Sequence, residues 1–234
     1  WSNAAQTTIG NDSIPDFNAN TNPPDPNQLT TDNVDAMAFV RTGATGGVPD
    51  YDLYYSVRGT GGSRLYRANP ANGSAAAVQN QPWGVRGDIY ANTPGDVGVT
   101  TGMAFIGGTL YGVSSSGLFY SISTSSGRAS NVVNLGPAFA GLTAGPQNVE
   151  GGAYANTLFA IDSGGTLYAL STSGQLQPVF ANGATSVSTN LGGATGLAFS
   201  PADVNLWHPT MERRGDAGHG INSTFDNSRS ITRL

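Results

Sequence analysis

A repeated set of short apolar segments constrains the fold of this chain more than any other feature of its sequence. Each unit opens with a small residue followed by apolar residues, and a second segment with an apolar–aromatic step follows after a turn. The opening segments lie at 36–39, 102–105, 151–154 and 196–199, and the second segments lie at 52–54, 109–111, 157–159 and 205–207. Such self-similarity indicates one supersecondary unit stacked several times.

The spacing of the repeat identifies the unit. Phe105 and Tyr154 are 49 residues apart, and Tyr154 and Phe199 are 45 apart. The preceding interval is longer because an insertion is expected at 80–99. A period of about 45–50 residues with four short strands is typical of one propeller blade, whereas a β-sandwich would not explain why the same segments recur in the same order. We therefore predict an all-β, partial β-propeller of about three and a half four-stranded blades, with few helices.

The predicted organisation has an extended N-terminal arm or linker, then the blades, then an irregular tail or interrupted blade. Three prolines exclude a helix or central strand from part of the arm. The expected boundaries are 1–33 for the arm, 34–80, 100–147 and 148–193 for three blades, 194–207 for an incomplete fourth blade, and 208–234 for the tail. Because propellers usually have four to eight blades, the missing ones would come from further residues, from an identical chain, or from the two terminal segments.

Composition excludes several classes of function. The chain has no Cys, and its ten basic residues are all Arg. It therefore offers no thiol nucleophile, no Cys-based metal site, no Schiff-base lysine and no phosphate-loop lysine. A net charge of −5 argues against nucleic acid, and no apolar run predicts a membrane span. Low Lys and Cys with abundant Asn, Ser, Thr and Gly favour a secreted or cell-surface protein.

Both histidines of the chain lie in one short segment, which is the best candidate for any metal chemistry. His208, Glu212, Asp216 and His219 offer imidazole and carboxylate groups, which together suit zinc, manganese or iron. The spacing matches no helical zinc motif, and a proline follows the first histidine. The alternative is a structural loop in which neighbouring arginines pair with the acids. We favour the loop and predict no catalytic residue.

Three further groups of residues are candidate sites. Trp83 and Tyr90, in the expected insertion, could form a platform for a glycan or a peptide. Aspartates at 32–35 and 50–52 offer oxygen ligands for calcium, but no complete calcium loop is present, and turns are the preferred interpretation. Among the acids considered for glycosidase chemistry, Asp162 precedes a Ser-Gly-Gly turn, where capping is its expected role.

The segments 102–105 and 110–114, Gly-Met-Ala-Phe and Leu-Tyr-Gly-Val-Ser, resemble the propeller repeats of large secreted bacterial proteins, broadly the PQQ/YncE-like superfamily. The stretch 196–221 also resembles a segment of very long exported multi-domain bacterial proteins. The resemblance implies an architecture and no particular activity. The tryptophan-docking pattern of quinoprotein dehydrogenases is lacking, so no PQQ cofactor is expected.

These observations favour a structural or interaction module of an exported protein rather than an enzyme. Its expected partners are other protein chains, copies of itself or the rest of a larger polypeptide, reached through the propeller edges and the terminal segments. The alternatives are a glycan- or peptide-binding propeller and a metal-dependent enzyme that uses the segment 208–219.

Overall fold

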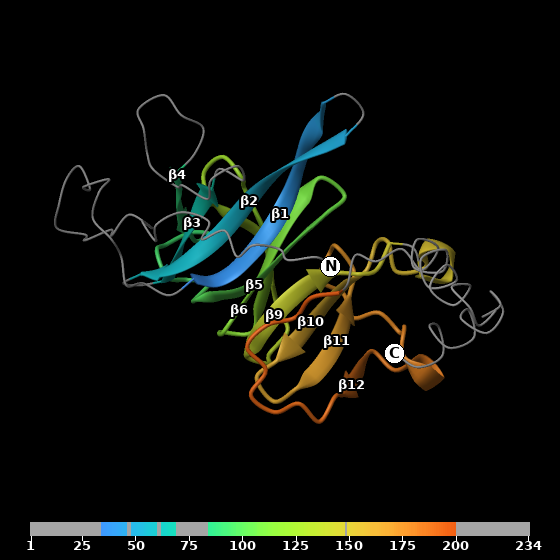
Figure 1. Ribbon diagram of the computed structural model, residues 1–234. Helices are drawn as coiled ribbons and strands as arrows, with labels where there is room; N and C mark the ends of the chain where they lie inside the picture. Colours follow the sequence, from blue (N-terminus) through green and yellow to red (C-terminus); the bar gives the residue numbers. More distant parts are fainter. Residues whose placement is uncertain (1–33, 46–47, 60–61, 69–83, 148, 200–234) are drawn as a thin grey trace, which may run out of the picture.

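The computed structural model describes residues 34–45, 48–59, 62–68, 84–147 and 149–199, which form three antiparallel sheets of four strands each (Figure 1). The first sheet has β1 (Val34–Thr45), β2 (Val48–Gly59), β3 (Gly62–Ala68) and β4 (Gly84–Ile89). The second has β5 (Thr100–Ile106), β6 (Thr109–Ser114), β7 (Leu118–Ile122) and β8 (Ala129–Asn134). The third has β9 (Phe139–Ala144), β10 (Leu158–Asp162), β11 (Thr166–Leu170) and β12 (Ser186–Ser188). The described residues are thus an all-β partial propeller, as the repeat predicts.

The sheets stack face to face because their strands are apolar on both faces. Side chains of the first sheet, among them Ala38, Tyr54 and Leu65, pack in one core with Met103 and Tyr120 of the second sheet. The opposite face of the second sheet forms another core with the third. This second core contains Ala104, Tyr111, Val113 and Phe119 from the second sheet and Leu142, Leu158, Ala160 and Leu170 from the third.

The strand that opens the third sheet differs from the one predicted. The segment 151–154 was expected to be a strand, but Val149–Gly152 is a short 3-10 helix, and β9 takes the opening position. Gly151 and Gly152 have φ values of +67° and +86°, which a β-strand does not accommodate. The prediction for 151–154 is therefore wrong.

The edges of the sheets also differ from the expected blade boundaries. The first sheet extends to Ile89 because β4 lies inside 80–99, the segment expected to be an insertion. The pairing of β3 with β4 changes register between Leu65 and Tyr66, so β4 lacks a clean alternation of apolar and polar residues. The third sheet begins at Phe139, nine residues before the expected boundary at 148.

A buried set of hydroxyl groups joins the first sheet to the second. Ser56 donates a hydrogen bond to the carbonyl of Thr100 (3.1 Å), and the N–H of Thr100 donates to Ser63 Oγ (3.0 Å). The Thr100 hydroxyl lies 2.8 Å from the hydroxyl of Tyr120. All four residues are buried. Both main-chain groups of Thr100 are therefore satisfied by side chains of the neighbouring sheet.

Replacing Tyr120 by Phe is expected to lower the free energy of unfolding by about 1–2 kcal/mol. The substitution keeps the ring but leaves the buried Thr100 hydroxyl without this partner. Denaturant unfolding followed by circular dichroism measures the change. Tyr111→Phe is the matched control, because Tyr111 is buried but its hydroxyl has no hydrogen bond to another described residue. Equal effects of the two substitutions would contradict the role of the hydroxyl pair.

Candidate functional site

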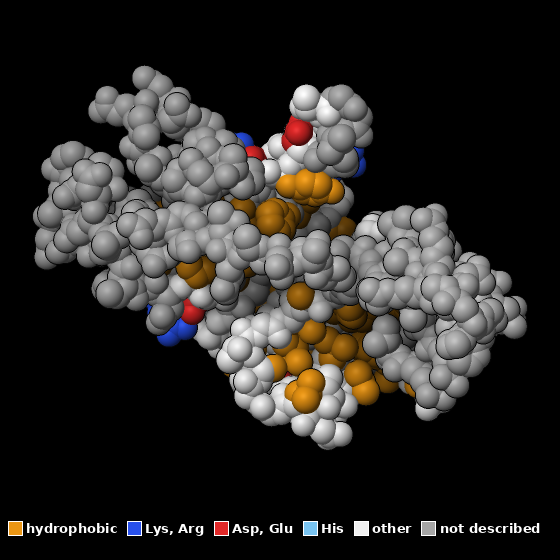
Figure 2. All heavy atoms as spheres, in the orientation of Figure 1, with side chains coloured by type: hydrophobic (Ala, Val, Ile, Leu, Met, Phe, Trp, Pro, Cys, Tyr) orange, Lys and Arg blue, Asp and Glu red, His pale blue; other side chains and the backbone are white. Residues whose placement is uncertain are grey.

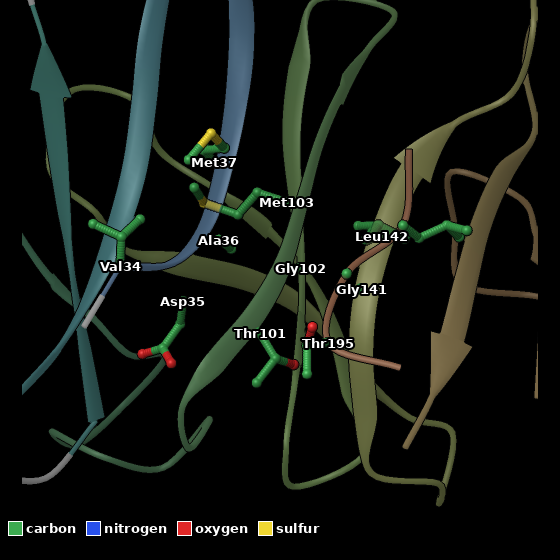
Figure 3. A pocket seen from close by; sticks show the side chains of 12 residues that line it. Val34, Asp35, Ala36, Met37, Thr101, Gly102, Met103, Gly141, Leu142 and Thr195 are labelled. Atoms are coloured by element: carbon green, nitrogen blue, oxygen red, sulfur yellow. The ribbon is translucent and has the colours of Figure 1, made fainter. Parts of the chain in front are cut away.

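The innermost strands of the three sheets curve around a hollow of about 200 Å³ (Figure 3). A fourth segment, 195–197, completes its wall, although it is not part of a regular strand. The lining residues are Val34, Asp35, Ala36, Met37, Thr101, Gly102, Met103, Gly141, Leu142, Thr195, Gly196 and Leu197. Equivalent positions of four repeat units therefore meet at one place, which is the position of the central channel in a propeller.

Glycine is required where the inner strands approach one another. A Cβ on Gly102 would lie 2.3 Å from the backbone N of Leu142 and 2.6 Å from the carbonyl carbon of Gly141. A Cβ on Gly141 would in turn lie 2.6 Å from the backbone N of Leu197. These distances are shorter than real Cβ contacts, so the backbones pack closer than any side chain allows. The segment around Leu197 thus lies against β9 as β9 lies against β5.

Two polar side chains of the hollow, Asp35 and Thr101, are engaged with the protein. The carboxylate of Asp35 accepts two hydrogen bonds from the Arg58 guanidinium, at 2.8 and 3.3 Å. The hydroxyl of Thr101 donates to the carbonyl of Phe139 at 2.6 Å, which links the second sheet to the third. The described lining contains no nucleophile paired with a general base.

The outer face of the first sheet carries an apolar stripe at the surface. Met37 and Phe39 of β1 are 61% and 62% exposed, and Tyr51 of β2 is 47% exposed. We call Met37, Phe39 and Tyr51 the outer stripe. Figure 2 shows hydrophobic side chains at the surface where Figure 1 places β1 and β2. Large apolar side chains gathered at the surface are typical of an interaction site.

Of the residues predicted to form the binding platform and the histidine-containing metal site, only Tyr90 lies in the described part of the chain. Tyr90 is half-buried, and the guanidinium of Arg128 lies 3.9 Å from the centre of its ring. The N–H of Ala129 donates to the carbonyl of Tyr90 at 2.9 Å. Tyr90 therefore joins the segment after β4 to β8. The other predicted residues, Trp83, His208, Glu212, Asp216 and His219, lie outside the described residues.

The aspartates considered for calcium that lie in the described part of the chain, Asp35, Asp50 and Asp52, are engaged in ion pairs or hydrogen bonds. Asp52, which is buried, pairs with Arg67 across the first sheet. Asp50 accepts a hydrogen bond from Thr45 at 2.7 Å. Within the ranges that the structure describes, no group of three or more His, Cys, Asp or Glu side chains is placed to hold a metal ion. No helix among the described residues has the length and apolar character needed to span a membrane.

Asp162 is a turn-capping residue. Its carboxylate accepts a hydrogen bond from the Thr166 N–H at 2.8 Å and another from the Tyr168 hydroxyl at 3.0 Å. Burial acts to raise the pKa of Asp162, but these hydrogen bonds favour the charged form and bring its pKa below the usual value. The capping role expected from the sequence is confirmed.

Replacing Asp162 by Ala is expected to lower the free energy of unfolding by about 1 kcal/mol at neutral pH, because these hydrogen bonds are lost. Since the pKa is lower in the folded than in the unfolded chain, the contribution of Asp162 is complete above the unfolded value of about 4. It disappears as the pH falls through the folded value. Urea unfolding at several pH values should therefore show a wild-type advantage that fades in acid. An advantage of equal size at pH 7 and pH 3 would contradict this account.

The fold of this chain is distantly similar to several solved structures. No family model matches the chain, and no curated protein matches it. Hydrazine synthase of Kuenenia stuttgartiensis is 12% identical over 72% of this chain, with a TM-score of 0.43. Saccharomyces cerevisiae Sqt1 is 15% identical over 67% of the chain, with a TM-score of 0.40. The BBS1N domain, solved in complex with ARL6DN, is 16% identical over 63% of the chain, with a TM-score of 0.40.

The chain spans a minority of the length of these structures. It covers 39% of the hydrazine synthase chain, 36% of Sqt1 and 37% of BBS1N. The fold class therefore rests on the sheets of this chain itself: three four-stranded antiparallel sheets stacked around a common hollow.

Proposed function

We propose that this chain is a structural and interaction module of an exported bacterial protein, secreted or held at the cell surface, and not an enzyme. In this proposal it is a propeller region of the PQQ/YncE-like kind. It binds other protein chains through the outer stripe, which is the exposed part of the outer face of its first sheet. The outer stripe, at Met37, Phe39 and Tyr51, is the observation that carries the proposal.

The chemistry of the stripe supports protein as the partner. Met37 and Phe39 are large, apolar and more than half exposed, and they stand on a regular strand that holds them in fixed positions. On the same face, Tyr55 and Tyr66 are buried and stack at 5.2 Å between ring centroids, so the surface available for binding is the stripe beside them. Aromatic residues and methionine are enriched in protein interfaces, where a rigid apolar surface loses little conformational entropy on binding.

A site-specific cross-linking experiment tests the proposal. A photo-crosslinking phenylalanine derivative is placed at position 39 of the protein in the cells that produce it, and cell fractions are then irradiated. The control carries the same group at position 132, because Val132 is exposed on β8, in the second sheet. We expect cross-links to protein chains from position 39, in the exported or surface fraction, and few or none from position 132.

Two results would overturn the proposal. One is the absence of protein cross-links at position 39. The other is equal cross-linking from positions 39 and 132. That result would mean that protein chains contact the stripe no more often than they contact another exposed apolar position.

A further inference from the structure

Two residues of the outer stripe, Met37 and Phe39, occupy positions that are covered elsewhere in the same molecule. Met37 and Phe39 of β1 correspond to Met103 and Phe105 of β5, since both pairs occur in a small-Met-Ala-Phe segment and both strands pair in the same way with the next strand. Met103 is only 3% exposed, compared with 61% for Met37. It is buried because the first sheet covers it.

The surfaces that cover Met103 and its counterpart in β9 are made of the same kinds of residue. Over Met103 the surface contains Ala38, a small residue of the inner strand, and Tyr54, which pairs with Ala38 from the second strand. Over Leu142, the corresponding residue of β9, it contains Ala104 paired with Tyr111. Each covering surface therefore joins a small inner-strand residue to an aromatic residue beside it.

At the far end of the described stack, the segment beside the third sheet has the first part of another such covering surface. Phe199 packs on Phe159 of the third sheet, with ring centroids 5.0 Å apart. Ala198 is exposed, and in the repeat it holds the position of Ala38 and Ala104. The chain thus carries an uncovered stripe at one end and the small residue of a covering surface at the other.

We propose that the outer stripe is the docking site for a second copy of this chain, packed head to tail, so that Met37 and Phe39 of one copy lie beside Ala198 of the other. This inference rests on the proposed function and names its partner. At the inner strand, the second copy repeats the contact that the chain already makes twice within itself, between its first and second sheets and between its second and third. Farther out on the same face, Tyr55 and Tyr66 are already buried and take no part in the docking. A two-fold axis forms the same contact at both ends and closes the ring.

The number of sheets favours two copies. One copy has three described sheets and the inner segment of a fourth, so two copies supply between six and eight. Closed propellers contain about four to eight blades. Three copies would supply at least nine, which is above this range.

The first test is the native mass of the 234-residue protein, measured by light scattering over a range of concentrations. We expect twice the 23.9 kDa of one chain. Replacing Met37 and Phe39 by Ser should weaken the association by about tenfold or more, since it removes the apolar centre of the contact. Both side chains are exposed in one copy, so circular dichroism should show an unchanged fold. Val132→Ser, another exposed apolar position, should leave the mass at two chains.

The second test fixes the geometry and does not depend on the serine variants. Because the chain contains no Cys, two singly substituted proteins, Met37→Cys and Ala198→Cys, can be mixed and oxidised with no competing thiol. We expect disulfide-linked pairs that contain one of each. The proposal is overturned by a mass of one chain at every concentration, by a two-chain mass that the serine variants do not change, or by cross-links only between identical variants. If position 39 instead cross-links to a different protein in cells, the proposed function stands and the second-copy partner is wrong.

Discussion

Gly102→Ala is expected to lower the free energy of unfolding by about 3 kcal/mol or more, a large effect for one methyl group. The added Cβ would lie 2.3 Å from the backbone N of Leu142 and within 2.9 Å of the Cα of Gly141. Both contacts are with main chain, so no flexible side chain can move aside. The two inner strands must separate, which opens the core between the second and third sheets. Denaturant unfolding followed by circular dichroism measures the loss.

Gly196→Ala is the matched control for this substitution. Gly196 lines the same hollow and holds the corresponding position in its segment, but a Cβ there meets no atom within 4 Å, and its φ is not positive. We expect this substitution to change the unfolding free energy by less than about 0.5 kcal/mol. If both alanine variants are equally stable, β5 and β9 can separate at little cost, and the close approach of Gly102 to Gly141 and Leu142 does not stabilise the fold.

Phe159→Ala is expected to cost about 3–5 kcal/mol, the usual range for removal of a buried phenylalanine. Phe159 is buried on the outer face of the third sheet, where its ring makes edge contacts with Tyr154 (6.0 Å), Phe180 (6.0 Å) and Phe199 (5.0 Å between centroids). These partners come from three separate segments of the chain. Loss of the ring removes the contact that seats Phe199 on the sheet.

The measurement has two parts. Urea unfolding reports the global loss, and hydrogen exchange followed by mass spectrometry reports whether 195–199 becomes less protected. Leu191→Ala is the control, because Leu191 is 65% exposed and its truncation should have little effect on either quantity. A stability loss without faster exchange at 195–199 would show that Phe159 does not seat this segment.

The sequence predicted those strands that have a strong apolar–aromatic alternation. The segments around Leu53-Tyr54, Leu110-Tyr111 and Leu158-Phe159 lie in β2, β6 and β10, the second strands of the three sheets. This signal is strong because these strands are buried on both faces and therefore need large apolar residues at successive positions. The fold class followed from the recurrence of these segments in the same order.

The sequence did not identify the inner strand of the third sheet. Gly141-Leu142 in β9 matches Gly102-Met103 and Gly196-Leu197, and this small–apolar step could have located the strand. The aromatic residue that ends the other opening segments is replaced by Ala144, and this weakened the match. The Gly-Gly pair at 151–152 gave a false signal, because a glycine that adopts positive φ and one that allows close packing look alike in a sequence.

The candidate site could be predicted only in part, because exposure depends on which sheets are neighbours. The residues Met37 and Phe39 were recognised as repeat residues, and nothing local separates them from Met103 and Phe105. Their difference comes from the position of the first sheet at the end of the stack. The identity of the residues is local information, whereas their availability for binding is a property of the assembled fold.

The hydroxyl groups around Thr100 also bear on how the chain avoids misfolding. The faces that pack together in the stack are near copies of one another, so a sheet could dock against the wrong neighbour during folding and still bury much of its apolar surface. Ser56 and Ser63 form hydrogen bonds with the main chain of Thr100 only when the first sheet packs against the second, as in the native fold. A misplaced sheet would leave buried polar groups unsatisfied, at a cost of about 1–3 kcal/mol each. These few polar contacts thus select the correct order among sheets that hydrophobic packing alone would scarcely distinguish.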